Sequence, residues 1–301
     1  MQVKTIEKNI ENKVIDWINS INEKSVKKYL KSDIIVTGGC ISSMFLQEDV
    51  NDYDIYIKNM DILVALAKYY TKDYPSIVVL DGRKQTEYLS KLKKPGIEKI
   101  AIENLKYNQI KLFFTDKNGG YLPKHSINEK KDGYVPLFFG YVPVFFSPNA
   151  ITLSNNIQIV LRFNGNPEEI HKNFDFIHAT NYFTFKEGLV TNKQALESLL
   201  TKQLKYQGSL YPLTSIIRMK KFIKRGWNIN AGEILKIMFQ ISELDLKDPN
   251  VLEEQLIGVD VAYFQKLIEL LRDTTPEKIT SHYLNTLIDR VFNESTDETG
   301  I

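Results

Sequence analysis

The chain has a single cysteine, Cys40, and therefore cannot form a disulfide within itself. Such sparse cysteine usage is typical of proteins in a reducing compartment. The sequence also lacks a signal peptide and an apolar run of about 18 residues, so we expect a cytoplasmic protein with no membrane partner. A net charge of only +2 excludes a generally basic nucleic-acid binder and confines any such surface to a local patch.

In other respects the composition is that of an ordinary globular protein. Hydrophobic residues make up 43% of the chain and charged residues 25%, and 301 residues are enough to bury a substantial core. This length suits one large domain or two modest ones. Lys, Asn and Ile are abundant, as in AT-rich genomes, which indicates a low-GC microbe or its phage.

The most informative stretch begins with an apolar run that is followed by two glycines. Ile34–Val36 predicts a short buried strand, and Gly38 and Gly39 permit backbone angles that other residues avoid. The residues after the glycines predict a short helix, whose free N–H groups would attract phosphate. Ser42 and Ser43 add hydroxyl donors in the first turn of that helix.

An acidic pair comes next in the chain. Twelve residues separate Gly39 from Asp52, and Tyr53 and Asp54 follow directly. On a strand, the alternation of side chains places Asp52 and Asp54 on one face. Two adjacent carboxylates repel each other, and a divalent cation such as Mg²⁺, which prefers oxygen ligands, would remove that cost. The alternative is an ordinary strand–turn–helix–strand unit with two exposed aspartates.

The glycine pair and the acidic pair together resemble the motif of the DNA polymerase β-like nucleotidyltransferase superfamily. The matching residues are Gly38-Gly39 and Asp52-Tyr53-Asp54. The nearest group in motif is that of tRNA CCA-adding enzymes and poly(A) polymerases. That group usually carries Arg-Asp after its glycines, where this chain has Ser42-Ser43, so the chain departs from the pattern of CCA addition itself. The resemblance implies an α/β fold, with a mixed sheet backed by helices and a C-terminal helical domain.

Members of this superfamily carry a third metal-binding carboxylate on a strand beside the Asp-x-Asp strand. Asp175 resembles it, because hydrophobic residues flank it on both sides, as on a strand. Asp116, which ends an apolar run, is the alternative. The long gap between the acidic pair and Asp175 implies an insertion around residues 80–150.

Residues 213–225 predict an amphipathic helix with a basic face. Arg218 and Lys221 lie three residues apart and therefore share one side of that helix. Nucleotidyltransferases of the CCA-adding type carry a basic helix in the corresponding place, where it contacts phosphates or the acceptor strand. The resemblance therefore implies that Arg218 and Lys221 bind nucleotide; a solvated basic face is the alternative.

The resemblance implies a domain order and a reaction. A nucleotidyltransferase domain would span residues 1–190 and a helical domain residues 191–301. The enzyme would transfer a nucleoside monophosphate from an NTP such as ATP to an acceptor hydroxyl. The residues expected to bind Mg²⁺ or Mn²⁺ and to act in catalysis are Asp52, Asp54 and Asp175. The residues expected to bind the nucleotide are Gly38, Gly39, Ser42, Ser43, Arg218 and Lys221.

The acceptor is not fixed by these motifs. An RNA 3′ end, such as that of a tRNA, is the first expectation, because of the glycine motif and the basic helix. A protein or a small molecule is an alternative acceptor, since one fold hosts many substrates. A non-catalytic nucleotide- or nucleic-acid-binding protein on the same fold is the alternative from a different functional class. The sequence leaves the oligomeric state open.

Overall fold

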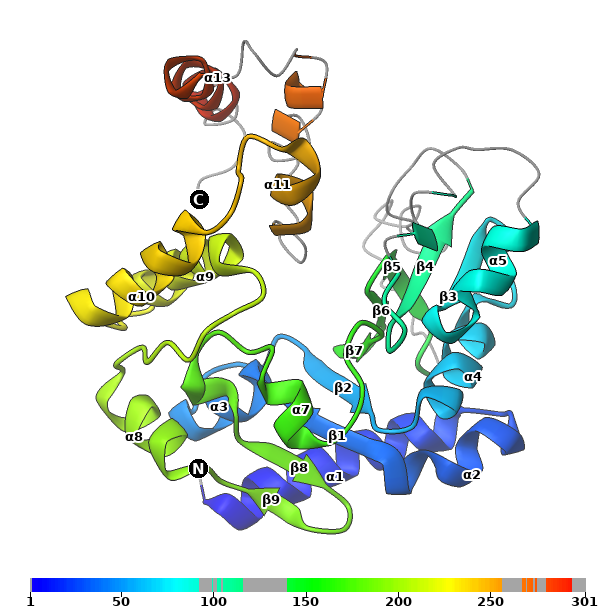
Figure 1. Ribbon diagram of the computed structural model, residues 1–301. Coiled ribbons are helices and arrows are strands. Elements are labelled where there is room, and N and C mark those ends of the chain that lie inside the picture. Colours follow the sequence, from blue (N-terminus) through cyan, green and yellow to red (C-terminus); the bar gives the residue numbers. More distant parts are fainter. Residues whose placement is uncertain are drawn as a thin grey trace, which may run out of the picture. The chain divides into compact units, whose positions relative to one another are not determined.

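Figure 1 shows the computed structural model of the chain, which divides into two compact units. Unit 1 comprises Met1–Lys172 and His178–Leu200, and unit 2 comprises Asn173–Ile177 and Thr201–Ile301. The division therefore falls ten residues beyond the expected end of the first domain at 190, and a five-residue segment crosses into unit 2. The structure describes residues 2–91, 99, 102–103, 105–115, 140–255, 267–268, 270–272, 274 and 280–293.

Helices and strands are interspersed along the first 201 residues. The helices are α1 (Val3–Ser20), α2 (Lys24–Asp33), α3 (Gly39–Leu46), α4 (Met60–Thr71), α5 (Gln85–Lys91), α7 (Pro167–His171) and α8 (Lys193–Thr201). Two 3-10 turns are η1 (Gly82–Lys84) and η3 (Ile177–Ala179). The strands are β1 (Ile34–Thr37), β2 (Tyr53–Ile57), β3 (Ile77–Asp81), β4 (Ile110–Phe114), β5 (Pro143–Ser147), β6 (Ala150–Leu153), β7 (Ile157–Val160), β8 (Tyr182–Thr184) and β9 (Gly188–Val190).

Within the described residues, the larger sheet has the strand order β5-β6-β7-β2-β1-β8-β9. It is a mixed sheet, because β2 and β7 run parallel while the other neighbouring pairs are antiparallel. Strand β5, which carries Pro143, lies at an edge, where a proline costs no ladder hydrogen bond. The predicted fold class, a mixed sheet backed by helices, is confirmed.

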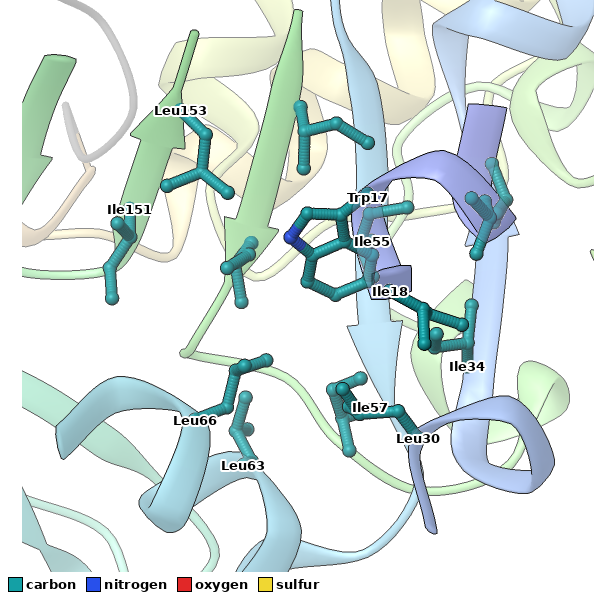
Figure 2. Packing of buried hydrophobic residues seen from close by; sticks show 14 of the residues in the cluster. Trp17, Ile18, Leu30, Ile34, Ile55, Ile57, Leu63, Leu66, Ile151 and Leu153 are labelled. Carbon is teal, nitrogen blue, oxygen red and sulfur yellow. The ribbon is translucent and has the colours of Figure 1, made fainter. Parts of the chain in front are cut away.

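The core of unit 1 lies between this sheet and the first helices. Every third or fourth residue of α1 is apolar, and this stripe is fully buried at Ile6, Ile10, Val14 and Trp17. Figure 2 shows Trp17 among side chains from β2, α4 and β6. Its indole Nε1 donates to the Tyr70 hydroxyl at 2.8 Å, which satisfies a polar atom that burial would otherwise penalise.

A second, two-stranded sheet is formed by β3, at the start of the expected insertion, and β4, which lies within it. Asp81 ends β3 and caps η1 by accepting from the Arg83 N–H at 3.1 Å. Its carboxylate also pairs with the Arg83 guanidinium, and this pairing lowers the pKa of Asp81. Residues 97–102 predict a strand, but the two of them that the structure describes, Lys99 and Ile102, are helical. The alternative metal ligand Asp116 lies outside the described residues.

Unit 2 is helical in the part that the structure describes, apart from isolated β-bridges. Its helices are α9 (Pro212–Lys224), α10 (Ala231–Ser242), α11 (Pro249–Gln255) and α13 (Ser281–Asn293). The Asn230 side chain caps α10 by accepting from the Glu233 N–H at 3.0 Å, as the Asn-x-x-Glu spacing predicts. Among the described residues, no helix of either unit is both long and apolar enough to cross a membrane.

The predicted strand around Asp175 is wrong. Asp175 lies in a bend between α7 and η3, and only its neighbour Phe176 forms an isolated bridge, with Tyr206. The apolar side chain of Phe176 packs against the rings of Tyr206 and Phe222 in unit 2, and not into a strand of the sheet. The strand that does lie beside β2, opposite β1, is β7.

Candidate functional site

The glycine turn joins β1 to α3. Gly38 has φ 98° and ψ −148°, a conformation that is essentially restricted to glycine. A Cβ at this position would lie 3.0 Å from Asp54 Oδ2. The absence of a side chain therefore serves two purposes, the turn itself and the close approach of the backbone to the acidic strand.

The N-terminus of α3 begins at this turn. No side chain caps the helix at Gly38, and a Cβ at Gly39 would meet nothing within 4 Å. The first backbone N–H groups of a helix have no partner within it, and in α3 these are the N–H groups of Gly39, Cys40 and Ile41. This end of α3 combines partial positive charge with open space beside Gly39.

The acidic pair lies on and just before β2. Asp54 is half-buried on the strand, and Asp52 is exposed one residue before it begins. Although Asp52 is exposed, nearby protein atoms displace part of the water around its carboxylate, and this desolvation raises its pKa. Burial and the Asp54 carboxylate together raise the pKa of Cys40, so this thiol is neutral and unsuited to act as a nucleophile.

A hydrogen-bond network fixes the glycine turn from behind. The Gly38 N–H donates to the Ala179 carbonyl at 3.1 Å. The Thr37 hydroxyl donates to the Asn181 carbonyl at 2.9 Å, and its oxygen lies 2.8 Å from His171 Nε2. Because the Thr37 proton is committed to a carbonyl, the imidazole donates to the Thr37 oxygen. The turn is therefore held by backbone groups far along the chain.

The imidazole in this network predicts a pH dependence of stability. Burial lowers the pKa of His171 from 6.5 to about 4, with Glu168 opposing the shift. The unfolded chain binds the proton first, so the free energy of unfolding falls as pH drops from about 6.5 towards 4, by at most about 1.4 kcal/mol per pH unit from this group. Urea denaturation across this range should show a flatter pH slope for His171→Gln than for the wild type. Equal slopes would contradict the assignment.

Each predicted serine has a different environment. Ser42 is buried, and its hydroxyl donates to the His178 carbonyl at 2.9 Å. A hydroxyl has one proton, so Ser42 cannot offer it to a phosphate while this bond persists. Ser43 is half-buried on the same turn of α3. The predicted roles of both serines in nucleotide binding stay predictions.

The structure pairs two of the predicted site residues with each other. Arg218 Nη1 lies 2.9 Å from Asp175 Oδ2 within unit 2, and the Asp175 side chain is only 10% exposed. Asp175 thus already has a cationic partner. Lys221 is exposed on α9, together with Lys220, Lys224 and Arg225.

A residue that the sequence patterns did not indicate faces Asp54. Gln158 on β7 is paired with Asp54 in the parallel ladder. Gln158 is not a carboxylate, and pairing between residues 104 positions apart in the chain leaves no local signal in the sequence. Within the described residues, no three His, Cys, Asp or Glu side chains gather into a metal site.

The family model that matches this chain is described as "Gad2: Gabija anti-defense 2 family protein" and covers residues 8–202. The chain belongs to the Gabija anti-defense 2 family. A curated relative, "Gabija anti-defense 2" of Bacillus phage SPbetaL7, is 20% identical over 281 residues. That match covers 92% of this chain but only 53% of the relative, so the chain spans about half of the length of that family member. That relative is a phage protein, in line with the composition, which indicates a low-GC microbe or its phage.

Solved structures similar to this family member include CCA-adding enzymes. The CCA-adding enzyme of Thermotoga maritima, complexed with tRNA, is 12% identical, with a TM-score of 0.43 over 100% of this chain and 57% of that chain. The Bacillus stearothermophilus CCA-adding enzyme in complex with CTP is 9% identical, with a TM-score of 0.37 over 93% of this chain and 63% of that chain.

Proposed function

We propose that the chain is a nucleotidyltransferase that moves a nucleoside monophosphate from an NTP to an acceptor hydroxyl. The observation that carries the proposal is the close approach of Gly38 to Asp54. It brings the uncapped N-terminus of α3, which suits an anion, beside the acidic strand, which suits a cation. A triphosphate with its divalent cation presents both charges within one ligand.

The donor set fits Mg²⁺ or Mn²⁺. The carboxylates of Asp52 and Asp54 are hard oxygen ligands, and their positions two residues apart, just before and on β2, place them on the same side of an extended backbone. The raised pKa of Asp52 also favours a bound cation, because the negative charge of its carboxylate is unfavourable until a cation offsets it. When bound, the metal would supply activation of the acceptor hydroxyl and stabilisation of the leaving pyrophosphate. Asp175 as a third ligand remains a proposal from the sequence.

The glycine turn would hold the triphosphate. The backbone N–H groups of Gly39, Cys40 and Ile41 have no partner within α3 and could donate to phosphate oxygens. Gly39 leaves room for that approach. The network that holds Gly38 from behind keeps these donors in place before the ligand arrives, and preorganised donors are the most effective ones.

An RNA 3′ end is the acceptor we propose, supported by the exposed basic residues of α9. Lys221→Gln with Lys224→Gln should weaken RNA binding and reduce the log–log salt slope by about 0.7 for each lost phosphate contact with a single strand. Fluorescence titration at several salt concentrations measures the slope. Arg218→Ala is a poor probe, because it strands the buried Asp175 carboxylate and should cost about 1–3 kcal/mol of stability. An unchanged slope in the double variant would mean that the basic face of α9 is solvated and does not bind RNA.

One incubation separates the acceptor classes. The purified protein, Mn²⁺ or Mg²⁺ and each NTP labelled at the α-phosphate are mixed with total cellular RNA, with cell protein or with the small-molecule fraction. Label in RNA that is removed by ribonuclease supports the proposed acceptor. Label in protein or in a small molecule keeps the transferase proposal and replaces the acceptor.

The family description supports a role in anti-defense, and we propose that nucleotidyl transfer serves it. A non-catalytic binder is the second candidate, favoured by the finding that no three His, Cys, Asp or Glu side chains gather among the described residues. Cells that carry the Gabija defense and express either the wild type or Asp54→Asn separate the two. Phage growth restored only by the wild type supports transfer, and equal restoration by a folded Asp54→Asn supports the binder.

A further inference from the structure

The strand beside the acidic pair presents an amide. Figure 1 shows β7 next to β2, and the parallel register pairs Asp54 with Gln158. Their neighbours in the ladder, Ile55, Ile157 and Ile159, are fully buried in the core. Since alternate residues face opposite sides of a sheet, Gln158 and Asp54 share the other face, about 4.8 Å apart at the backbone.

The next strand orients that amide. Gln158 Nε2 donates to Thr152 Oγ1 on β6 at 3.3 Å, and Thr152 is the residue paired with Gln158 in the antiparallel ladder. Strand β6 lies on the side of β7 away from β2. With its nitrogen engaged by β6, the Gln158 amide keeps its oxygen as the atom that could bind a cation beside Asp54. An amide oxygen beside a carboxylate is favourable when a cation lies between them.

We infer that Gln158 supplies the third oxygen ligand of the divalent-cation site, beside Asp52 and Asp54. This inference rests on the proposed function, since it names a further ligand for the same metal. Amide oxygens bind hard cations as carboxylates do, but without a charge. The site therefore carries one negative charge fewer than a site of three carboxylates, and it should bind the cation more weakly than such a site would.

The test is a titration of Mn²⁺ with the metal-free protein, in which electron paramagnetic resonance counts the free ion. Gln158→Glu keeps the size of the side chain and adds a charge, and should lower the Kd for Mn²⁺ by about tenfold. Gln158→Leu removes the oxygen and should raise the Kd by about threefold to tenfold. Gln194→Glu is the matched control, because it makes the same chemical change at an exposed position on α8 and should leave the Kd unchanged. Thermal denaturation of each variant confirms that it is folded.

The outcomes separate this inference from the proposed function. Loss of Mn²⁺ binding in Asp54→Asn with unchanged binding in both Gln158 variants would overturn the role of Gln158 and leave the metal site standing. A loss in Asp175→Asn equal to that in Asp54→Asn, with both Gln158 variants unchanged, would assign the third ligand to Asp175. Absence of Mn²⁺ binding in the wild type would overturn both the inference and the proposed function.

Discussion

Asp52→Asn and Asp54→Asn are each expected to abolish nucleotide transfer while the fold remains intact. Asparagine keeps the size of the side chain but removes the charge that binds the metal, and metal-based stabilisation carries most of the rate in phosphoryl-type transfer. We expect a fall of at least about a thousandfold in transfer rate. For Asp52→Asn the free energy of unfolding without metal should hold or rise at neutral pH, because the raised pKa of Asp52 shows that its charge opposes folding.

Asp49→Asn is the matched control for this pair. Asp49 is an exposed aspartate in the loop just before β2, three residues from Asp52, and it makes no part of the proposed site. Its substitution should leave both the transfer rate and the melting temperature unchanged. Wild-type transfer by Asp52→Asn or Asp54→Asn would remove these residues from the reaction. Unfolding of both would make the aspartates structural.

Gly38→Ala is expected to lower stability and abolish nucleotide binding together. The backbone at φ 98° and ψ −148° costs a residue with a side chain about 1–3 kcal/mol. The new Cβ would also lie 3.0 Å from the Asp54 carboxylate and would displace one of the two. Chemical denaturation measures the first effect, and fluorescent nucleotide titration in the presence of Mg²⁺ measures the second.

Gly39→Ala isolates the role of the open space. No atom would lie within 4 Å of its Cβ, and alanine suits the first turn of a helix better than glycine does. Its stability should therefore hold or rise by up to about 1 kcal/mol, while nucleotide binding weakens because the Cβ occupies the path to the N–H groups. If Gly38→Ala proved as stable as Gly39→Ala, the strain assigned to the turn would be wrong.

Local patterns in the sequence predict the framework of the site correctly. The apolar run at Ile34–Val36 is β1, the glycines open α3, and the acidic pair marks the start of β2. These features depend on periodicity and on the backbone freedom of glycine, and both act within a few residues. Strands β8 and β9, of three residues each, are too short for an alternating pattern to indicate them.

Apolar flanks misled the prediction at Asp175. Hydrophobic residues on both sides are typical of a buried strand, but Phe176 is apolar because it enters an aromatic cluster of unit 2. The apolar residues beside Asp175 therefore predict burial correctly, but they predict a strand where the chain forms a bend. A short apolar run does not distinguish a strand from a bend that inserts side chains into a core.

Residue type does not show whether a side chain is already engaged. Ser42 and Arg218 are the right kinds of donor for a phosphate, yet Ser42 bonds to the His178 carbonyl and Arg218 pairs with Asp175. Gln158 shows the converse, because only the register of β7 against β2 brings it beside Asp54. Both facts depend on contacts between distant parts of the chain.

The position of the transferred label tests the central claim most directly. The wild type is incubated with the accepting fraction and Mg²⁺, and with NTP labelled either at the α-phosphate or at the γ-phosphate. Nucleotidyl transfer predicts that the α label becomes covalently attached to the acceptor while the γ label is released as pyrophosphate, and that Asp54→Asn does neither. Attachment of the γ label, or attachment of neither label by the folded wild type with any acceptor fraction, would contradict the account.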